Sequence, residues 1–201
     1  KDLEQLPSGA RKRADLAGAE VARLERLLED ILLYAKPLTL ERAAVDLVGL
    51  IQETITAESV QAGEIQFLST PCPAVAADAD RLRQVLINLL RNARQASPAG
   101  SPIRIQCGPA NTDRVEVEIA NQGAVIPKDT LERVFEPFFT SKGGSTGTGL
   151  GLPIVRRIVS AHGGEIKLES DERSGTRAIL HLPIMAGTAT AYRNQAADEA
   201  G

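Results

Sequence analysis

The most regular pattern of hydrophobic and polar positions lies between residues 81 and 96. Apolar residues recur there every three or four positions, at Leu82, Val85, Leu86, Leu89, Leu90, Ala93 and Ala96. This spacing predicts a helix with one buried face. A second stripe at helical spacing is made of neutral amides, at Gln84, Asn88, Asn92 and Gln95. The helix is therefore expected to bury one face in a core and to present its amides either to a cleft or simply to solvent.

A longer helical pattern at about residues 15–36 carries an apolar seam on alternating three- and four-residue steps. The seam consists of Val21, Leu24, Leu28, Ile31 and Ala35. Leu27 and Leu32 widen it, and charged residues flank it, which favours a helical bundle or dimer. Packing of this helix on its own domain is the alternative. Residues 7–9, Pro-Ser-Gly, are expected to form a turn before it, and Pro37 is expected to end it.

Shorter patterns follow between residues 45 and 185. Helices are expected at 48–62, 81–96, 128–134 and 150–161. Strands are expected at 45–47, 65–69, 75–77, 103–107, 115–120, 165–169 and 177–182. Asp78 or Asp80 is expected to cap the helix at 81–96, and residues 174–176 to turn the last strand pair. Because the order lacks βαβ regularity, we predict an α+β fold, a two-layer α/β sandwich with helices 48–62, 81–96 and 150–161 over one sheet face.

Composition narrows the possible partners. The 201 residues are 43% hydrophobic and 3% aromatic, which indicates an aliphatic core. A net charge of −3 argues against a nucleic-acid partner, since a basic face is needed for that. No apolar run approaches the ~20 residues of a membrane span, so no membrane contact is expected. Cys72 and Cys107 have no CxxC spacing, which favours a cytoplasmic setting over a disulfide framework, and no zinc site is indicated.

The segment from Gly143 to Gly151 has five glycines in nine residues. Without Cβ atoms, backbone N–H groups can turn toward an anion, and the helix that follows adds its N-terminal N–H groups. No Gly-Lys-Ser/Thr follows, so it is not a Walker loop, and the spacing does not match a dinucleotide fingerprint. We interpret it as a phosphate-binding loop rather than a flexible linker. Lys142, directly before it, is suited to meet terminal phosphates as a point charge.

Three of the four phenylalanines fall within residues 135–139, in the segment FEPFFTSK. An aromatic cluster inside a loop indicates either a docking surface or lid latch, or a small satellite core beneath the loop. Both interpretations remain open from sequence.

The order of these motifs resembles the catalytic domain of bacterial sensor histidine kinases. The likeness rests on the Asn-bearing helix, Asn121-Gln122-Gly123, FEPFFTSK, GTGLGL, HGG and Gly175-Thr176. It covers about residues 45–184 and looks most like the subgroup typified by nitrogen-regulation sensors. The fold implied is the ATP-binding sandwich shared with gyrase, the Hsp90 chaperones and MutL. The resemblance divides the chain into a partial dimerisation segment (1–44), an ATP-binding domain (45–185) and a disordered tail (186–201).

The resemblance also implies roles for individual residues. Asn92, and secondarily Asn88, would hold Mg²⁺ at the nucleotide phosphates, and Lys142 would join them in catalysis. Residues 127–148 would form a lid over ATP, and Thr176 would lie by the adenine. The full set implied for nucleotide binding is Asn88, Asn92, Gln95, Asn121, Gly123, Ile126, Lys142, Gly147, Thr148, Gly149, Leu150, Gly151, Leu152 and Thr176.

The activity implied is transfer of the ATP γ-phosphate to a histidine on the first dimerisation helix, expected before residue 1. The implied partners are ATP or ADP, the receiver domain of a response regulator, and a second copy bound through the dimerisation helices. His162, at a Gly-Gly turn, and His181, on a terminal strand, do not resemble the acceptor.

Two departures from the family pattern leave alternatives open. The family's first glycine box reads Asp-x-Gly-x-Gly, whereas Asn121 and Val125 stand at its first and last positions here. A nucleotide sensor or scaffold with weak ATP affinity is therefore one alternative. An ATPase of the gyrase or chaperone type is another. It is disfavoured because those enzymes carry a general-base Glu where this chain has Asn88, and an amide has no useful basicity.

Overall fold

The computed structural model describes residues 8–58, 64–140 and 148–185. The chain forms two compact units, residues 1–37 and 38–201. The predicted tail at 186–201 lies outside the described residues. In the described part of the chain, no helix is both long and apolar enough to cross a membrane.

The first unit contains one helix, α1 (Ser8–Ala35). It begins well before the predicted start at residue 15, and Ser8 and Gly9 belong to the helix rather than to a turn. The reason is that residues 10–14, Ala-Arg-Lys-Arg-Ala, are strong helix formers that offset the cost of Gly9. Apolar side chains along α1 are exposed, namely Leu16, Val21, Leu24, Leu28, Ile31 and Leu32.

The second unit is built on a five-stranded sheet in the order β2–β4–β5–β7–β6. Its strands are β2 (Ile65–Ser69), β4 (Ile103–Pro109), β5 (Arg114–Asn121), β6 (Glu165–Asp171) and β7 (Gly175–Pro183). β2 runs parallel to β4, and the other neighbouring strands are antiparallel. A separate antiparallel pair joins β1 (Ala43–Val45) to β3 (Val75–Ala77).

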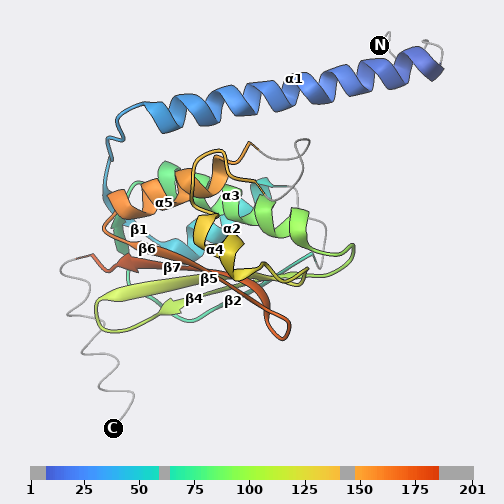
Figure 1. Ribbon diagram of the computed structural model, residues 1–201. Coiled ribbons are helices and arrows are strands. Elements are labelled where there is room, and N and C mark those ends of the chain that lie inside the picture. Colours follow the sequence, from blue (N-terminus) through green and yellow to red (C-terminus); the bar gives the residue numbers. More distant parts are fainter. Residues whose placement is uncertain (1–7, 59–63, 141–147, 186–201) are drawn as a thin grey trace. The chain divides into compact units, whose positions relative to one another are not determined.

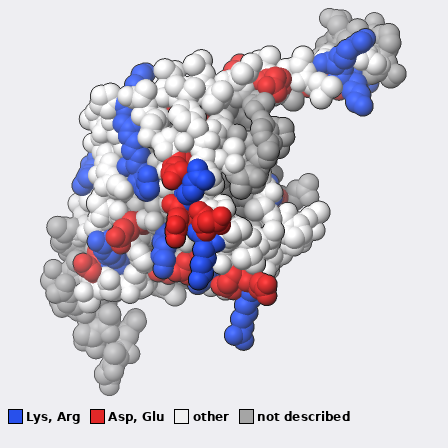
Figure 2. Space-filling view, in the orientation of Figure 1, with Lys and Arg blue, Asp and Glu red and all other residues white. Residues whose placement is uncertain are grey.

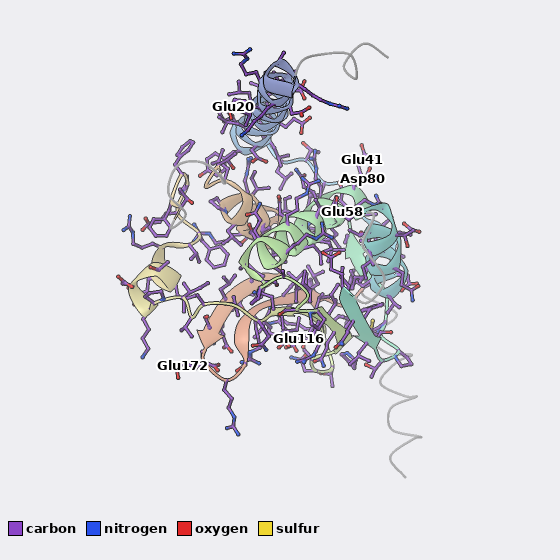
Figure 3. The ribbon with its side chains drawn as sticks, turned by 90° about the vertical axis from the view of Figure 1, so that its right-hand side faces the viewer. Glu20, Glu41, Glu58, Asp80, Glu116 and Glu172 are labelled. Carbon is purple, nitrogen blue, oxygen red and sulfur yellow. The ribbon has the colours of Figure 1, made fainter. Side chains whose placement is uncertain are left out.

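The described residues of this unit also form four helices: α2 (Leu47–Ala57), α3 (Ala79–Ala96), α4 (Lys128–Arg133) and α5 (Gly151–Ala161). α2, α3 and α5 lie over the same sheet face, with α3 packed between α2 and α5 (Figure 1). Figure 3 shows Glu58 and Asp80 in this helical layer and Glu116 on the sheet. The predicted two-layer α+β sandwich is confirmed.

The apolar face of α3 forms the centre of the core. Its predicted inward residues from Leu82 to Ala93 are all buried, whereas Ala96, which was also predicted to face inward, is exposed at the end of the helix. The helix contacts β4 and β5, whose side chains Ile105, Val117 and Ile119 are also buried. Burial of one Leu, Ile or Val contributes about 1.5–3 kcal/mol, so this face contributes substantially to the stability of the unit.

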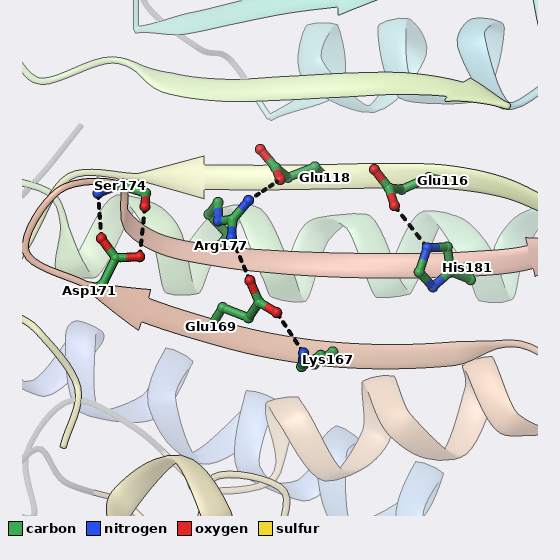
Figure 4. Close-up of polar contacts among 8 residues, drawn as sticks. All are labelled: Glu116, Glu118, Lys167, Glu169, Asp171, Ser174, Arg177 and His181. Atoms are coloured by element: carbon green, nitrogen blue, oxygen red, sulfur yellow. Dashed lines mark hydrogen bonds and ion pairs between the residues drawn. The ribbon is translucent and has the colours of Figure 1, made fainter. Parts of the chain in front are cut away.

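The outer sheet face is polar, as the alternation in the strands requires. Arg177 on β7 contacts Glu118 on β5 and Glu169 on β6, and His181 pairs with Glu116 at 2.8 Å (Figure 4). On the molecular face drawn in Figure 2, Lys and Arg are interspersed with Asp and Glu. Partly exposed pairs of this kind contribute roughly 0–1 kcal/mol each, so the core rather than this face holds the sheet.

Asp78 caps α3, which settles the alternative left open between Asp78 and Asp80. Its carboxylate accepts hydrogen bonds from the backbone N–H of Arg81 at 3.1 Å and of Glu41 at 3.0 Å. Burial raises the pKa of Asp78, but these hydrogen bonds and the charge of Arg81 outweigh it, so the pKa lies below its ordinary 3.8. The stabilisation from this carboxylate is therefore present above that pH and is lost as the pH falls below it.

His162 joins this cap to the end of α5. Its Nε2 accepts from the backbone N–H of Asp78 at 3.0 Å, and its Nδ1 lies 2.8 Å from the carbonyl oxygen of Ile158. The side chain is 1% exposed. Nε2 thus links the end of α5 to the cap of α3, and Nδ1 is engaged within α5 itself, which is a structural role.

Several predicted boundaries differ from the structure. The strand predicted at 45–47 lies at 43–45, because Asp46 caps α2 by accepting from the backbone N–H of Val48 at 3.0 Å. α2 ends at Ala57 rather than at residue 62. The last turn lies at residues 172–174, where the N–H groups of Arg173 and Ser174 donate to Asp171. Gly175 and Thr176 are therefore part of β7.

Candidate nucleotide-binding site

Asn88 and Asn92 lie one turn apart on α3, on the side that faces the start of α5. An ideal Cβ placed on Gly151 would lie 3.8 Å from Oδ1 of Asn88 and 4.0 Å from Nδ2 of Asn92. The start of α5 therefore lies close to both amides. Within the described residues, Nδ2 of Asn88 is buried and has no hydrogen-bond partner. A buried polar atom without a partner is costly, and a bound ligand would remove that cost.

The start of α5 also offers backbone donors. No side chain caps this helix, whose cap position is Leu150, and the N–H of Leu150 is held by Oγ1 of Thr148 at 3.2 Å. The first-turn N–H groups of Gly151 and Leu152 have no intrahelical partners by geometry. A helix start of this kind favours an anion. Leu152 is partly exposed in this first turn.

Gly149 fixes how the loop returns to this helix. It has φ of +67°, and a Cβ there would lie 2.5 Å from the carbonyl carbon of Phe138. The N–H of Phe138 donates to the carbonyl oxygen of Gly149 at 2.9 Å. Phe138, in the middle of the predicted lid, is therefore in direct backbone contact with Gly149, and the contact leaves no room for a side chain at residue 149.

A second cluster forms where β5 and β6 end and β7 begins. Asn121 on β5 pairs in register with Thr176 on β7. The hydroxyl of Ser170 on β6 lies 2.9 Å from that of Thr176 and accepts from the N–H of Ile126 at 3.0 Å. These contacts bring three predicted nucleotide residues, Asn121, Ile126 and Thr176, to one end of the sheet.

The amide of Asn121 is oriented inside this cluster. The side chain is 5% exposed, and its Nδ2 donates to the carbonyl oxygen of Gln122 at 3.2 Å. That bond leaves Oδ1 as the acceptor. An acceptor at this position suits an amino group such as that of adenine.

Gly123 connects this cluster to α3. A Cβ there would lie 2.5 Å from the carbonyl oxygen of Ala96, which is too close for any residue other than glycine. Among the described residues, Phe138 is the one non-glycine with positive φ. Val125, which stands in the place of a family glycine, therefore does not have a positive φ and carries no backbone strain of that kind.

Other predicted residues are less closely joined to these two clusters. Gln95 is exposed near the end of α3. Lys142 and Gly147 lie outside the described residues. A hollow of about 310 Å³ at the ends of β2 and β4 includes Ser69, Thr70 and Gly108 and contains none of the predicted residues.

The three phenylalanines differ in their surroundings. Phe138 is 65% exposed, whereas Phe135 and Phe139 are partly buried. The guanidinium of Arg156 lies 5.4 Å from the ring centre of Phe135, and that of Arg133 lies 4.4 Å from the ring centre of Phe139. Two rings thus each contact an arginine, and the third faces solvent.

Sequence reasoning missed Ser170 and the backbone role of Phe138. Ser170 was excluded because the strand was predicted to end at residue 169, whereas β6 continues to Asp171. The available signal was that the strand could continue past residue 169, which would place Ser170 on the same strand face as Leu168. No sequence signal indicates the positive φ of Phe138, which follows from its contact with Gly149.

The chemistry of these residues fits a magnesium-bound nucleotide. Amide oxygens are hard ligands of the kind Mg²⁺ takes sparingly beside phosphate oxygens and its own waters. The unpartnered Nδ2 of Asn88 is a donor suited to a phosphate oxygen, and it belongs to the amide that lies close to the N-terminus of α5. The described residues contain no group of three or more His, Cys, Asp or Glu suited to a metal ion, so a metal here would depend on phosphates for most of its charge.

Comparison with known proteins defines the class of this domain. Residues 77–186 match the family described as histidine kinase-, DNA gyrase B- and HSP90-like ATPase, and the chain belongs to that family. It carries the ATP-binding catalytic domain of the sensor histidine kinase type. The chain is 37% identical to the sensor histidine kinase ZraS of Escherichia coli (strain K12) over 188 residues, 90% of this chain and 40% of ZraS. It is 32% identical to sporulation kinase E of Bacillus subtilis over 171 residues, 83% of this chain and 23% of that kinase.

Solved structures agree with this class. The histidine kinase ThkA, in complex with the response regulator TrrA, aligns with a TM-score of 0.75 and 33% identity over 90% of this chain and 53% of that chain. Full-length ShkA in complex with AMPPNP aligns with a TM-score of 0.75 and 26% identity, over 92% of this chain and 41% of that chain. The chain thus spans less than two thirds of the length of each of these four proteins.

Proposed function

We propose that this chain is the catalytic portion of a sensor histidine kinase that binds Mg²⁺-ATP and transfers the γ-phosphate to a histidine outside this chain, for relay to a response regulator. The observation that supports it most directly is the unpartnered Asn88 amide beside Asn92 and Gly151. This arrangement places a buried donor without a partner close to a helix start that favours phosphate.

In this proposal Asn92 and Asn88 hold Mg²⁺, which neutralises charge on the transferring phosphoryl group. The backbone of residues 147–151 cradles the phosphates, with Lys142 as an added cation. Asn121 and Thr176 receive the adenine through the acceptor Oδ1 and the hydroxyl. Catalysis by such a site is mostly positioning and charge neutralisation, so no general base is required from this domain.

Neither histidine of the chain suits the role of acceptor. Both ring nitrogens of His162 are engaged in buried hydrogen bonds, Nε2 with the backbone N–H of Asp78 and Nδ1 with the carbonyl oxygen of Ile158. Nε2 of His181 pairs with Glu116 on the outer sheet face. The exposed apolar seam of α1, which includes Leu24 and Leu28, fits pairing with further helices. We propose that this seam belongs to a dimerisation bundle that carries the acceptor.

Incubation with radiolabelled Mg²⁺-ATP tests the function. The expected result is acid-labile phosphate on a separately supplied dimerisation hairpin with its histidine, and none on this chain. Chelation of Mg²⁺ is expected to abolish the transfer. Phosphate on His162 or His181 would contradict the acceptor assignment. Release of inorganic phosphate without transfer would support an ATPase, and tight binding with neither activity would support a nucleotide sensor.

Asn121→Asp is expected to tighten ATP binding severalfold and to increase the preference for ATP over GTP. A carboxylate forms a charge-assisted hydrogen bond with the adenine amino group, roughly 0.5–1.5 kcal/mol stronger than the neutral pair. Guanine presents a carbonyl at that place and would leave the buried carboxylate unpaired. Calorimetric titration with ATP and GTP measures both effects.

Asn111→Asp is the matched control for this test. It adds the same charge in the exposed turn between β4 and β5, where Asn111 Oδ1 accepts from the N–H groups of Asp113 and Arg114. The control is expected to leave both affinities unchanged. Unchanged affinity and base preference in Asn121→Asp would remove residue 121 from base recognition.

A further inference from the structure

The two cysteines of this chain lie in contact although 35 positions separate them. The Sγ atoms of Cys72 and Cys107 are 3.8 Å apart, and Cys72 is half-buried while Cys107 is buried. Neither residue belongs to the nucleotide site. Cys107 pairs with Val117 in the β4–β5 register, whereas Ala120, next to Asn121, pairs with Arg104 at the other end of β4.

The fold holds the two thiols in place. β2 and β4 run parallel with Ser69 opposite Cys107, and the N–H of Thr70 donates to the carbonyl oxygen of Cys107 at 3.0 Å. The chain then turns through Pro71-Cys72-Pro73, in which Pro73 is buried. The rings on both sides of Cys72 restrict the backbone, so little conformational entropy opposes closure of the pair. A disulfide has an S–S distance of about 2.04 Å, which requires the thiols to approach by about 1.8 Å.

The geometry points to a reversible disulfide between Cys72 and Cys107, formed in response to a hydroperoxide, with Cys72 as the attacking thiol and Cys107 as the resolving thiol. The roles follow from exposure, since Cys72 is the accessible member and Cys107 lies beneath it. The pKa shifts of the two thiols agree with these roles. The hydrogen bond between the two thiols lowers the pKa of Cys72 and raises that of Cys107, and burial raises the pKa of Cys107 further.

Formation of the disulfide requires no reactant other than the hydroperoxide. The Cys72 thiolate attacks the outer oxygen of the hydroperoxide, the O–O bond breaks, and the leaving oxygen takes up a proton to form an alcohol or water. Cys72 is then a sulfenic acid, oxidised by two electrons. The Cys107 sulfur attacks the Cys72 sulfur as its thiol proton is lost, and the departing hydroxide accepts that proton to leave as water.

The disulfide would close a ring that contains β3 and all of α3. Such a ring restricts the unfolded chain and is expected to stabilise the domain. Because the pair lies away from Asn121 along β4, Mg²⁺-ATP affinity is expected to stay within about twofold on oxidation. The inference therefore goes beyond the proposed function and does not depend on it.

Treatment of the reduced full chain with stoichiometric hydrogen peroxide tests the inference. Because the chain has two cysteines, any intramolecular disulfide is this pair. We expect a mass lower by two hydrogen atoms, loss of both free thiols, and recovery of both on addition of dithiothreitol. The midpoint of thermal unfolding is expected to rise by about 4 °C or more in the oxidised form.

Two variants separate the roles of the thiols. Cys107→Ser is expected to stop at the Cys72 sulfenic acid, which dimedone traps, and Cys72→Ser is expected to lose the response to peroxide. If Cys107→Ser does not fold, Cys72→Ser carries the test, since that side chain is half-exposed. Intermolecular disulfides alone, oxidation to sulfinic acid without a disulfide, or equal reaction of Cys107 in Cys72→Ser would each overturn the inference.

Discussion

Replacement of Asn92 with alanine is expected to weaken Mg²⁺-dependent ATP binding by about tenfold or more. The physical reason is the loss of an amide ligand beside the transferring phosphates. Removal of one partner from a buried polar network costs roughly 1–3 kcal/mol, and 1.4 kcal/mol corresponds to a factor of ten. Calorimetric titration with ATP, in Mg²⁺ and in a chelator, measures the effect, which is expected only in Mg²⁺.

The folded state itself should tolerate this change. Asn92 is partly exposed, and alanine is the better helix former. Asn88→Ala is also expected to leave the stability of the nucleotide-free domain unchanged or improved, because it removes the unpartnered Nδ2 atom. Gln84→Ala, one turn before Asn88 on the same stripe, is the control and should bind nucleotide normally. Unchanged Mg²⁺-dependent affinity in Asn92→Ala would exclude that residue from the metal site.

Gly175→Ala is expected to destabilise the catalytic unit by about 2–5 kcal/mol. Gly175 has φ of +76°, which costs an L-residue roughly 1–2 kcal/mol, and its Cβ would collide with the carbonyl oxygen of Asn121. Relief of that collision requires a backbone shift at a further cost of about 1–3 kcal/mol. The expected fall in unfolding midpoint is about 5–10 °C, measured by circular dichroism.

Gly100→Ala is the control that separates the backbone strain of positive φ from the steric collision of an added Cβ. Gly100 has nearly the same φ, +79°, but an added Cβ meets nothing within 4 Å. It should therefore show only the strain, about 1–2 kcal/mol. Gly175→Ala should also weaken ATP binding, because the collision displaces Asn121, whereas Gly100→Ala should not. Equal effects of the two substitutions on stability and on affinity would contradict this explanation.

The strongest local patterns predicted the elements well. The helix predicted at 81–96 was found as Ala79–Ala96 with its apolar face buried, and the strands at 65–69 and 75–77 have their predicted bounds. Such segments are determined locally because their apolar period matches one type of secondary structure. Element ends were less predictable. Asp46 and Asp78 accept hydrogen bonds as helix caps, and Asp78 is also held by Glu41, a residue distant in sequence.

The sequence by itself determined the kinds of residues available to the site: the amides on one helix stripe, the glycines before α5, and the motif order that resembles sensor histidine kinases. Only the tertiary structure decided which of them meet. Strand register brings Asn121 opposite Thr176, and packing of α3 against α5 brings Asn88 and Asn92 to Gly151. The same holds for Cys72 and Cys107. The physical reason is that local periodicity specifies a face of a helix or strand, whereas contacts between faces depend on register and packing across the whole core.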